Sequence, residues 1–351
     1  SYAEQLDGET ERLKIAAGQG VIAPDFLLDK ALRQIKLARS GNTAGWGLVT
    51  SLANRTAGMG GDYGNQAWML ANDKIAPALD RQISELERQR KRATPDAGVW
   101  KFKDGDAYYS WALRAGTTTT MTPEEVHQMG LDQLRAIQAE MDTILKKEGY
   151  SQGSVGARME ALAKDPRFTF AEGDPGRAEI LKFLNARITD IRSRMPQAFN
   201  TLVKGNVEVR RLPPEEEPGA PGAYGGPGSI DGTIPGKFWI NLRTTELHTK
   251  FDLPDLTHHE AIPGHVWQGE YANKLPLIRT LLSFNAYSEG WALYAEQLAD
   301  ELGAYATDPV ARLGYLQSIA FRACRLVVDT GLHAKGWTRE QGVRFFVEVN
   351  G

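Results

Sequence analysis

The sequence contains little cysteine and no long apolar run. Its 351 residues include a single cysteine, Cys324, which excludes an internal disulfide and any metal site built from several thiolates. Within the apolar segment FRACRLVV, Cys324 is interpreted as a small buried residue. No segment approaches the roughly 20 apolar residues that a membrane-spanning helix needs. The opening segment SYAEQLDGETERLK is polar and acidic, unlike a signal peptide, so we expect no membrane span.

An excess of charge of one sign is also lacking. The sequence has 41 lysines and arginines against 44 aspartates and glutamates, and the two signs are interspersed. The sequence therefore shows no basic stripe that would follow a nucleic-acid backbone and no polybasic patch for anionic lipid. The balance of 42% apolar and 24% charged residues is that of an ordinary globular protein. We expect no nucleic-acid partner.

Helical patterns dominate residues 1–205. The clearest one begins after Thr122, which is typical of an N-cap, and ends at Gly149, with acidic residues in its first turn and lysines in its last. Proline and glycine then supply about half of residues 213–236, which predicts a loop. The loop leads into KFWINLRT, a short segment typical of a strand, and helical patterns return afterwards. The chain is therefore predicted to be mainly α with a small β element.

Three of the six histidines lie in the segment HHEAIPGH, which resembles an interrupted form of the zinc-binding pattern H-E-x-x-H. In the uninterrupted pattern the two histidines stand four residues apart on one helix face. Here His265 follows His259 by six residues, which on an unbroken helix is a rotation of about 240°. Pro263 and Gly264 predict a break in the helix, and such a break would return His265 to the side of His259.

The glutamate of the pattern is Glu260, the candidate general base for attack by water. A second histidine, His258, is an alternative ligand. It lies on the same face as His265 of a straight helix, but about 10 Å away along the axis, too far for both to bind one zinc ion at about 2 Å. His259 is therefore favoured as the ligand, with His258 left open.

A catalytic zinc site takes a third protein ligand, here from elsewhere in the chain. Glu289 in YSEGWALYAE lies 24 residues after His265 in an apolar and aromatic setting, where an unpaired carboxylate would be costly to bury. Between Tyr287 and Trp291, Glu289 is expected to be nearly enclosed and to bind the metal. Glu296, seven residues further along the same helix face, is expected to orient a ligand through a hydrogen bond.

Other side chains are candidates for stabilising or binding a substrate. Tyr224, Tyr287 and His333 are candidate donors to an oxyanion. Asp329 lies one helical turn before His333, where it would orient the imidazole. The candidates for binding a substrate carboxylate are two arginines of one helical segment, Arg322 and Arg325.

A resemblance to the bacterial domain-of-unknown-function family 885 rests on four segments, which are APGAYGGPGSIDGTIPGKFWINL, HHEAIPGH, SEGWALYAE and RACRLVVDTGLHAKGW. It covers residues 15–351, and the family is similar to the gluzincins, which are mainly helical zinc metallopeptidases. The resemblance implies zinc ligands at His259, His265 and Glu289 and a general base at Glu260. It also implies that the glycine-rich loop and the following strand form the substrate cleft and pair with an extended peptide, through Phe238, Trp239 and Asn241.

These features predict a helical metallopeptidase-like fold, with a helical region over residues 1–205 and a zinc-site region over residues 206–351 in one continuous catalytic domain. Family members are usually longer, so the chain is expected to be truncated at both ends or completed by a second polypeptide. The expected function is zinc-dependent hydrolysis of peptide bonds in short or extended peptides. The alternatives are a metal-dependent amidase or esterase and an inactive helical binding or scaffold protein. The compartment is left open, with export slightly favoured over the cytoplasm.

Overall fold

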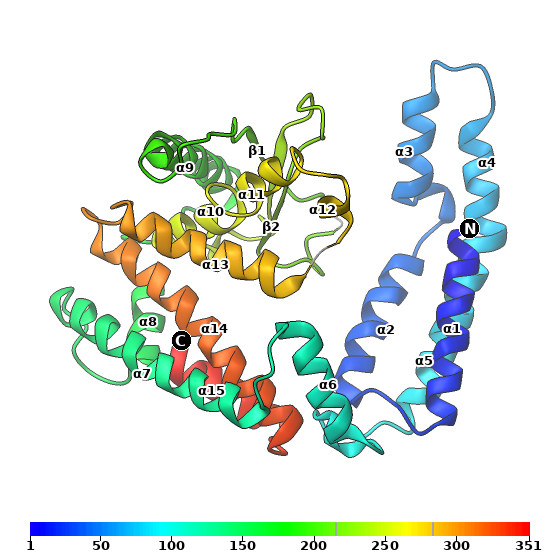
Figure 1. Ribbon diagram of the computed structural model, residues 1–351. Helices are drawn as coiled ribbons and strands as arrows, with labels where there is room; N and C mark the ends of the chain where they lie inside the picture. The colour runs from blue at the N-terminus through cyan, green and yellow to red at the C-terminus, as the bar shows by residue number, and fades with distance from the viewer. Residues whose placement is uncertain (215, 283) are drawn as a thin grey trace. The chain divides into compact units, whose positions relative to one another are not determined.

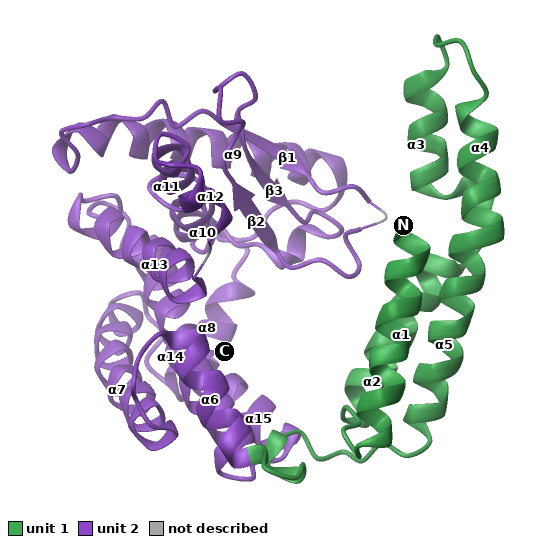
Figure 2. Ribbon diagram, turned by 45° about the vertical axis from the view of Figure 1, so that its right-hand side comes forward, with its two compact units in different colours: residues 1–105 green, residues 106–351 purple. Residues whose placement is uncertain are grey.

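The computed structural model describes residues 1–214, 216–282 and 284–351, which form a mainly helical structure with one small sheet (Figure 1). The chain folds into two compact units, Ser1–Gly105 and Asp106–Gly351 (Figure 2). The predicted mainly α class with a small β element is confirmed. The boundary predicted at residue 205 falls inside the second unit, where helices give way to the sheet.

The first unit is built from helices whose apolar sides face one another. Its helices are α1 (Tyr2–Gly18), α2 (Asp25–Arg39), α3 (Gly47–Thr56), α4 (Tyr63–Leu70) and α5 (Ala76–Arg90), with a π-helical turn at Ala71–Ile75 between the last two. Both α1 and α2 pack along α5, and they bury Ala17, Leu28, Leu32 and Leu86. The π-helical turn ends at Ile75, two residues before Pro77, whose ring nitrogen cannot donate a hydrogen bond to the preceding turn.

The second unit combines the sheet with the remaining helices. These are α6 (Gly105–Thr117), α7 (Pro123–Lys147), α8 (Val155–Ala163), α9 (Gly173–Arg194), α10 (Leu253–Glu260), α11 (His265–Ala272), α12 (Ile278–Leu281), α13 (Asn285–Glu301), α14 (Pro309–Ala334) and α15 (Arg339–Asn350). α7 begins at the predicted cap, where the Thr122 hydroxyl accepts a hydrogen bond from the Glu125 N–H. It packs so closely along α14 that a Cβ on Gly130 would lie 2.9 Å from the Ala323 carbonyl oxygen.

The core between α7 and α14 contains the single cysteine. Leu134 and Met141 of α7 lie in this core with Leu313 and Cys324 of α14. Burial raises the pKa of the Cys324 thiol to about 12, so Cys324 is the small buried residue that the sequence predicts. In the part of the chain that the structure describes, no helix combines the length and apolar character needed to cross a membrane.

Within the described ranges, the sheet has three strands, β1 (Val207–Arg211), β2 (Ala223–Gly226) and β3 (Gly236–Ile240), in the order β1-β3-β2. β1 runs parallel to β3, and β2 runs antiparallel to it. Alternation along β3 buries Phe238 and Ile240 in a core shared with Ile180, Leu184 and Ile191 of α9. Because β3 is central, β2 is an edge strand, and it contacts both α10 and α11.

Candidate metal site

The helix that carries the histidines is interrupted as the sequence predicts. α10 ends at Glu260, and α11 begins at His265. A Cβ on Gly264 would lie only 1.7 Å from the His259 carbonyl oxygen, so the chain can fold back against the end of α10 only with glycine there. Because the helix is broken between the two histidines, His265 is not rotated away from His259 as it would be on an unbroken helix. The two side chains instead face each other.

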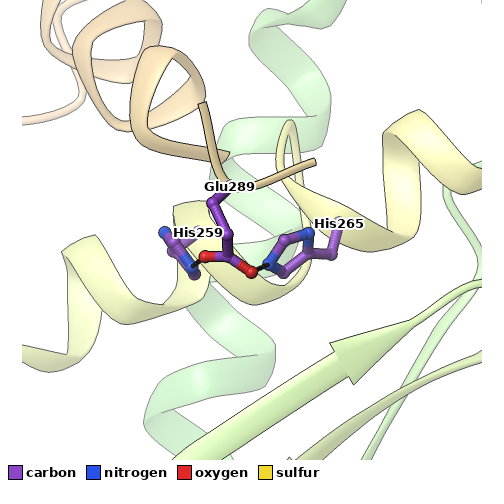
Figure 3. Close-up of side chains that lie close together, drawn as sticks. All are labelled: His259, His265 and Glu289. Atoms are coloured by element: carbon purple, nitrogen blue, oxygen red, sulfur yellow. Dashed lines mark ion pairs between the residues drawn. The ribbon is translucent and has the colours of Figure 1, made fainter. Parts of the chain in front are cut away.

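Three side chains from α10, α11 and α13 meet at this interruption (Figure 3). The two carboxylate oxygens of Glu289 lie 3.6 Å from His259 Nε2 and 3.6 Å from His265 Nε2. The imidazole rings are 4.9 Å apart and nearly perpendicular, and one ligand atom from each residue lies within 4.8 Å of the others. Burial lowers the pKa of His259 to about 4 and also lowers that of His265, so both imidazoles are neutral near pH 7 and keep a free lone pair.

The structure corrects the expected environment of Glu289. Its side chain is 64% exposed, and Tyr287 is 60% exposed, so Glu289 is not enclosed by aromatic side chains. The enclosed carboxylate is Glu296, which is fully buried two turns further along α13. The desolvation cost that the sequence assigns to Glu289 therefore applies to Glu296.

Glu296 contacts His259, the candidate ligand. Glu296 Oε1 lies 2.7 Å from His259 Nδ1 and accepts a hydrogen bond from the Arg322 guanidinium at 3.1 Å. The Ser318 hydroxyl donates to the other carboxylate oxygen at 3.2 Å. A carboxylate that accepts from Nδ1–H fixes the tautomer in which Nε2 carries the lone pair, and Nε2 is the atom that faces Glu289.

A second buried carboxyl group, which sequence analysis did not identify, extends this network. Asp255 lies on α10 one turn before His259, and the Tyr305 hydroxyl donates to it at 3.4 Å. Burial, together with the charge of Glu296, raises the pKa of Asp255 well above its ordinary value. The burial of these two neighbouring carboxyl groups therefore disfavours two negative charges in this network. The signal that would have identified Asp255 is an acidic residue four positions before a ligand on an otherwise buried helix.

His258 is turned away from the other two histidines. Its Nδ1 lies 2.8 Å from the Tyr305 hydroxyl, and the two rings are in edge contact at 5.5 Å. Burial lowers the pKa of His258 to about 3, so it is a neutral hydrogen-bonding residue of the core. Of the two neighbouring histidines, the geometry thus favours His259 as the ligand.

Glu260 is buried beside the three candidate ligands. Burial raises the pKa of its carboxyl group to about 7. The Gly225 N–H donates a hydrogen bond to this group, which lowers the pKa but does not cancel the effect of burial. A Cβ on Gly225 would lie 2.2 Å from the Glu260 carbonyl oxygen, so the absence of a side chain on β2 allows the strand to approach the end of α10. The edge strand thus holds the carboxylate in position.

A cavity of about 1150 Å³ opens over these residues. Tyr224 and Gly225 of β2 line one part of it, and Tyr287 of α13 lines another. His259, Glu260, His265 and Glu289 all border the cavity, so the candidate ligands and the candidate base face one space. Two of the predicted oxyanion donors, Tyr224 and Tyr287, therefore border the same cavity as the candidate ligands.

The third predicted donor lies elsewhere. His333 is eleven residues beyond Arg322 on α14, which is roughly 16 Å along a helix. It stacks on Tyr109 at 5.3 Å, and Asp329 accepts a hydrogen bond from the Tyr109 hydroxyl at 2.6 Å. The structure therefore does not bring His333 or Asp329 to the cavity, although the two remain neighbours, 3.9 Å apart.

The predicted substrate-binding residues have mainly structural positions. Phe238 is fully buried in the core, and the Asn241 amide donates to the Glu217 carbonyl at 2.8 Å within the loop. Trp239 lies opposite Tyr224 on β3, with ring centroids 6.4 Å apart. Arg322 is engaged with Glu296. Arg325 is exposed on α14.

Replacing Gly264 by alanine is expected to destabilise the fold by about 1–3 kcal/mol and to weaken metal binding, because the new Cβ would overlap the His259 carbonyl oxygen. The matched control is Gly290→Ala on α13, where no atom lies within 4 Å of the added Cβ. Alanine there should stabilise the helix by about 0.5–1 kcal/mol. Urea unfolding of both variants measures the difference. Equal stability of Gly264→Ala and the parent would show that this turn does not require glycine.

Comparison with known proteins identifies the family. The family model described as "Bacterial protein of unknown function (DUF885)" matches residues 1–351. A protein from Colwellia psychrerythraea, described as a "putative lipoprotein", has a crystal structure and is 36% identical in sequence to this chain. The two structures have a TM-score of 0.93, and the match covers 97% of this chain and 60% of that one. No curated protein matches.

A second solved structure, of a "putative lipoprotein of unknown function" from Shewanella oneidensis, has a TM-score of 0.67 over 99% of this chain and 64% of that one. At 21% identity it is similar in fold alone. The chain thus spans less than two thirds of the length of either protein. With its full length matched by the family model, the chain belongs to the DUF885 family of bacterial proteins.

Proposed function

We propose that the chain is a zinc-dependent hydrolase that cleaves peptide bonds, with His259, His265 and Glu289 as the metal ligands and Glu260 as the general base. The observation that carries the proposal is the convergence of these four side chains on one cavity, with the three ligand atoms within 4.8 Å of one another. Two imidazoles and one carboxylate are the ligands of one class of catalytic zinc sites.

The donor set fits a divalent cation on two further observations. His259 and His265 are neutral near pH 7 because burial lowers their pKa values, and neutral imidazole is the form that binds metal. The contact between His259 Nδ1 and Glu296 directs Nε2 toward Glu289. Zinc in such a site supplies a Lewis acid for the scissile carbonyl and for the attacking water.

Glu260 has the position and acidity of a general base. Its carboxylate would accept a proton from the attacking water and pass it to the leaving amine. The Gly225 N–H donates a hydrogen bond to the Glu260 carboxylate and holds it in place. The pKa of Glu260, about 7, lies near the pH at which a general base works best. Tyr224 lines the same cavity, and burial raises the pKa of its phenol, so it stays protonated and can donate to the developing oxyanion.

The free edge of the sheet supports a peptide as the substrate. The expectation that KFWINL pairs with a peptide does not fit the strand order, because β1 and β2 occupy both edges of β3. The Asn241 N–H donates to the Gly222 carbonyl at 2.9 Å, and this register turns the backbone groups of Ala223 and Gly225 away from β3. An extended peptide would add to β2 through the N–H and carbonyl of Ala223 and the carbonyl of Gly225, next to Glu260, which accepts from the Gly225 N–H.

The two alternative functions make different predictions. A metal-dependent amidase or esterase would use the same ligands and base but would not need the edge of β2. A scaffold protein would need neither metal nor Glu260. The free β2 edge beside the cavity favours the peptidase. The test is hydrolysis of a peptide panel by the zinc-loaded chain, with loss of activity on chelation and recovery on adding zinc.

Neighbouring histidines provide a matched test of the ligand set. His259→Gln is expected to lower zinc affinity by at least about 100-fold, because one of three protein ligands is lost. His258→Gln should retain about one zinc per chain, because His258 faces Tyr305 and not the cluster. Metal analysis after dialysis against a weak chelator checks both variants. Loss of zinc from His258→Gln with retention by His259→Gln would reverse the assignment.

We also propose that the protein is exported. The two solved proteins that it resembles in fold are both described as a "putative lipoprotein", a description that points to export. Fractionation of cells that express the full-length gene would test this: recovery of the protein in the cytoplasmic fraction alone would contradict it. A second polypeptide that completes the fold remains a prediction of the sequence.

A further inference from the structure

A second, smaller cavity lies beside the metal site. It has a volume of about 310 Å³, and it shares the side chains of Gln268, Ala272, Leu275 and Tyr287 with the large cavity. Half of the walls of the small cavity are therefore also walls of the large one. We call it the side pocket, because it adjoins the cavity that contains the candidate ligands and base.

The helices that supply the metal ligands also form the walls of the side pocket. On α11, Gln268 and Ala272 follow His265 at spacings of three and seven residues, so all three lie along one helix face. On α13, Tyr287 and Trp291 lie four residues apart and bracket Glu289 in the sequence. Pocket and ligand cluster are therefore held by the same two helices.

Aromatic rings make up most of the remaining wall. Phe199 lies 6.1 Å from Tyr271 and 6.5 Å from Trp291, measured between ring centroids. The Trp291 indole N–H donates to the Pro263 carbonyl at 2.9 Å, and the Tyr271 hydroxyl donates to the Thr201 carbonyl. The polar atoms of both rings are thus engaged, and their apolar faces are left to line the pocket.

No charged residue is among the described side chains that line the side pocket. Thr201 and Gln268 are the polar residues, and the other six are apolar or aromatic. An ionised substrate side chain would lose its hydration there without gaining a partner. A large apolar side chain would instead be removed from water against the partly exposed rings of Tyr271, Tyr287 and Trp291.

We propose that the side pocket is a specificity pocket, which binds an aromatic or long aliphatic side chain of a peptide substrate next to the bond that is cleaved. The proposal rests on the proposed peptidase function and adds the class of substrate. A volume of about 310 Å³ accommodates a phenylalanine or tryptophan side chain. Peptides with alanine, aspartate or lysine at the same position would leave the pocket unfilled or bury a charge in it.

The first experiment measures kcat/KM of the zinc-loaded chain for matched peptides that carry alanine, leucine, phenylalanine, aspartate or lysine at each position beside the cleaved bond, with the cleavage site identified by mass spectrometry. At one of these positions, phenylalanine and leucine are expected to exceed alanine by at least about tenfold. Aspartate and lysine are expected to fall below alanine. Cleavage without any such preference would overturn the proposal and leave the peptidase function standing.

Two variants test whether the preference comes from the side pocket. Ala272→Trp places a large side chain in the pocket and is expected to reduce the ratio of the phenylalanine to the alanine kcat/KM to about one. Tyr287→Ala removes an exposed wall without touching the core and should reduce the same ratio several-fold. The control is Ala186→Trp, an exposed position on α9, which should keep the parent ratio. An unchanged ratio in Ala272→Trp would overturn the assignment.

A binding measurement separates this proposal from the proposed function. Titration calorimetry of the zinc-loaded Glu260→Gln protein with the phenylalanine and alanine peptides reports binding without hydrolysis. The phenylalanine peptide is expected to bind at least about tenfold more tightly, and the difference should vanish when Ala272→Trp is added. If the parent chain cleaves no peptide but this difference is found, the pocket assignment stands and the peptidase assignment fails. Equal binding of both peptides overturns the pocket.

Discussion

Glu260→Gln is expected to lower kcat/KM for peptide hydrolysis by about 10²- to 10⁴-fold while the protein keeps its metal. Glutamine has nearly the same size, and its carbonyl can still accept the hydrogen bond that Gly225 gives to the carboxylate. The amide can hold a water molecule, but it cannot accept the proton that the water must lose. Steady-state kinetics and metal analysis of the same preparation would check the two parts of this expectation.

The control for this variant is Glu246→Gln, an exposed position on the 3₁₀ turn Thr245–Leu247. It makes the same chemical change away from the cavity and should keep full activity. Hydrolysis by Glu260→Gln within a few fold of the parent would remove Glu260 from the role of base. Loss of zinc from Glu260→Gln would show that Glu260 is needed for metal binding, and the loss of activity could then not be assigned to the missing base.

The interruption of the histidine helix could be predicted because its causes are local. Proline cannot continue the hydrogen bonding of α10, and the glycine after it allows the chain to pass against the His259 carbonyl. His265 then follows His259 by six positions, yet their rings lie 4.9 Å apart. The helix cap at Thr122 was predictable for the same reason, since its partner is three residues away.

The environments of Glu289 and Glu296 could not be predicted, because they depend on which helix covers each turn of α13. The two residues share one face of α13, seven positions apart. Ser318 and Arg322 of α14 contact Glu296, whereas Glu289 borders the large cavity. The sequence placed Glu289 beside the two histidines, as the structure does, but attributed to it the burial that belongs to Glu296.

The strand order and the contacts between distant parts of the chain could not be predicted from the sequence either. The segment KFWINL has the composition of a strand, but only the pairing with β1 and β2 makes it central and leaves the β2 edge free. His333 and Asp329 form a neighbouring pair as their helical spacing predicts. Both residues lie near the end of the long helix α14, away from the cavity. This could not be predicted, because the spacing of two residues gives no information on which end of their helix faces the cavity.

Glu289→Ala and Glu296→Ala are expected to affect the metal site in different ways, and the stability of the metal-free protein distinguishes them. Loss of Glu289 removes a ligand and should lower zinc affinity by at least about 100-fold. Because its side chain is 64% exposed, the melting temperature without metal should stay close to that of the parent. We expect zinc to raise the melting temperature of the parent but not that of this variant.

Loss of Glu296 should lower zinc affinity by about 10- to 100-fold, because His259 would no longer be oriented by the carboxylate. The same change leaves the Arg322 guanidinium and the Ser318 hydroxyl without their buried acceptor. Breaking a buried ion pair costs about 3–5 kcal/mol, which for a unit of this size lowers the melting temperature by roughly 6–20 °C. Calorimetry of both metal-free variants measures this, with zinc titrations beside it. A Glu296→Ala protein that melts like the parent without metal would contradict the stabilising role of the Glu296–Arg322 pair. A Glu289→Ala protein that binds zinc as tightly as the parent would require a different ligand set.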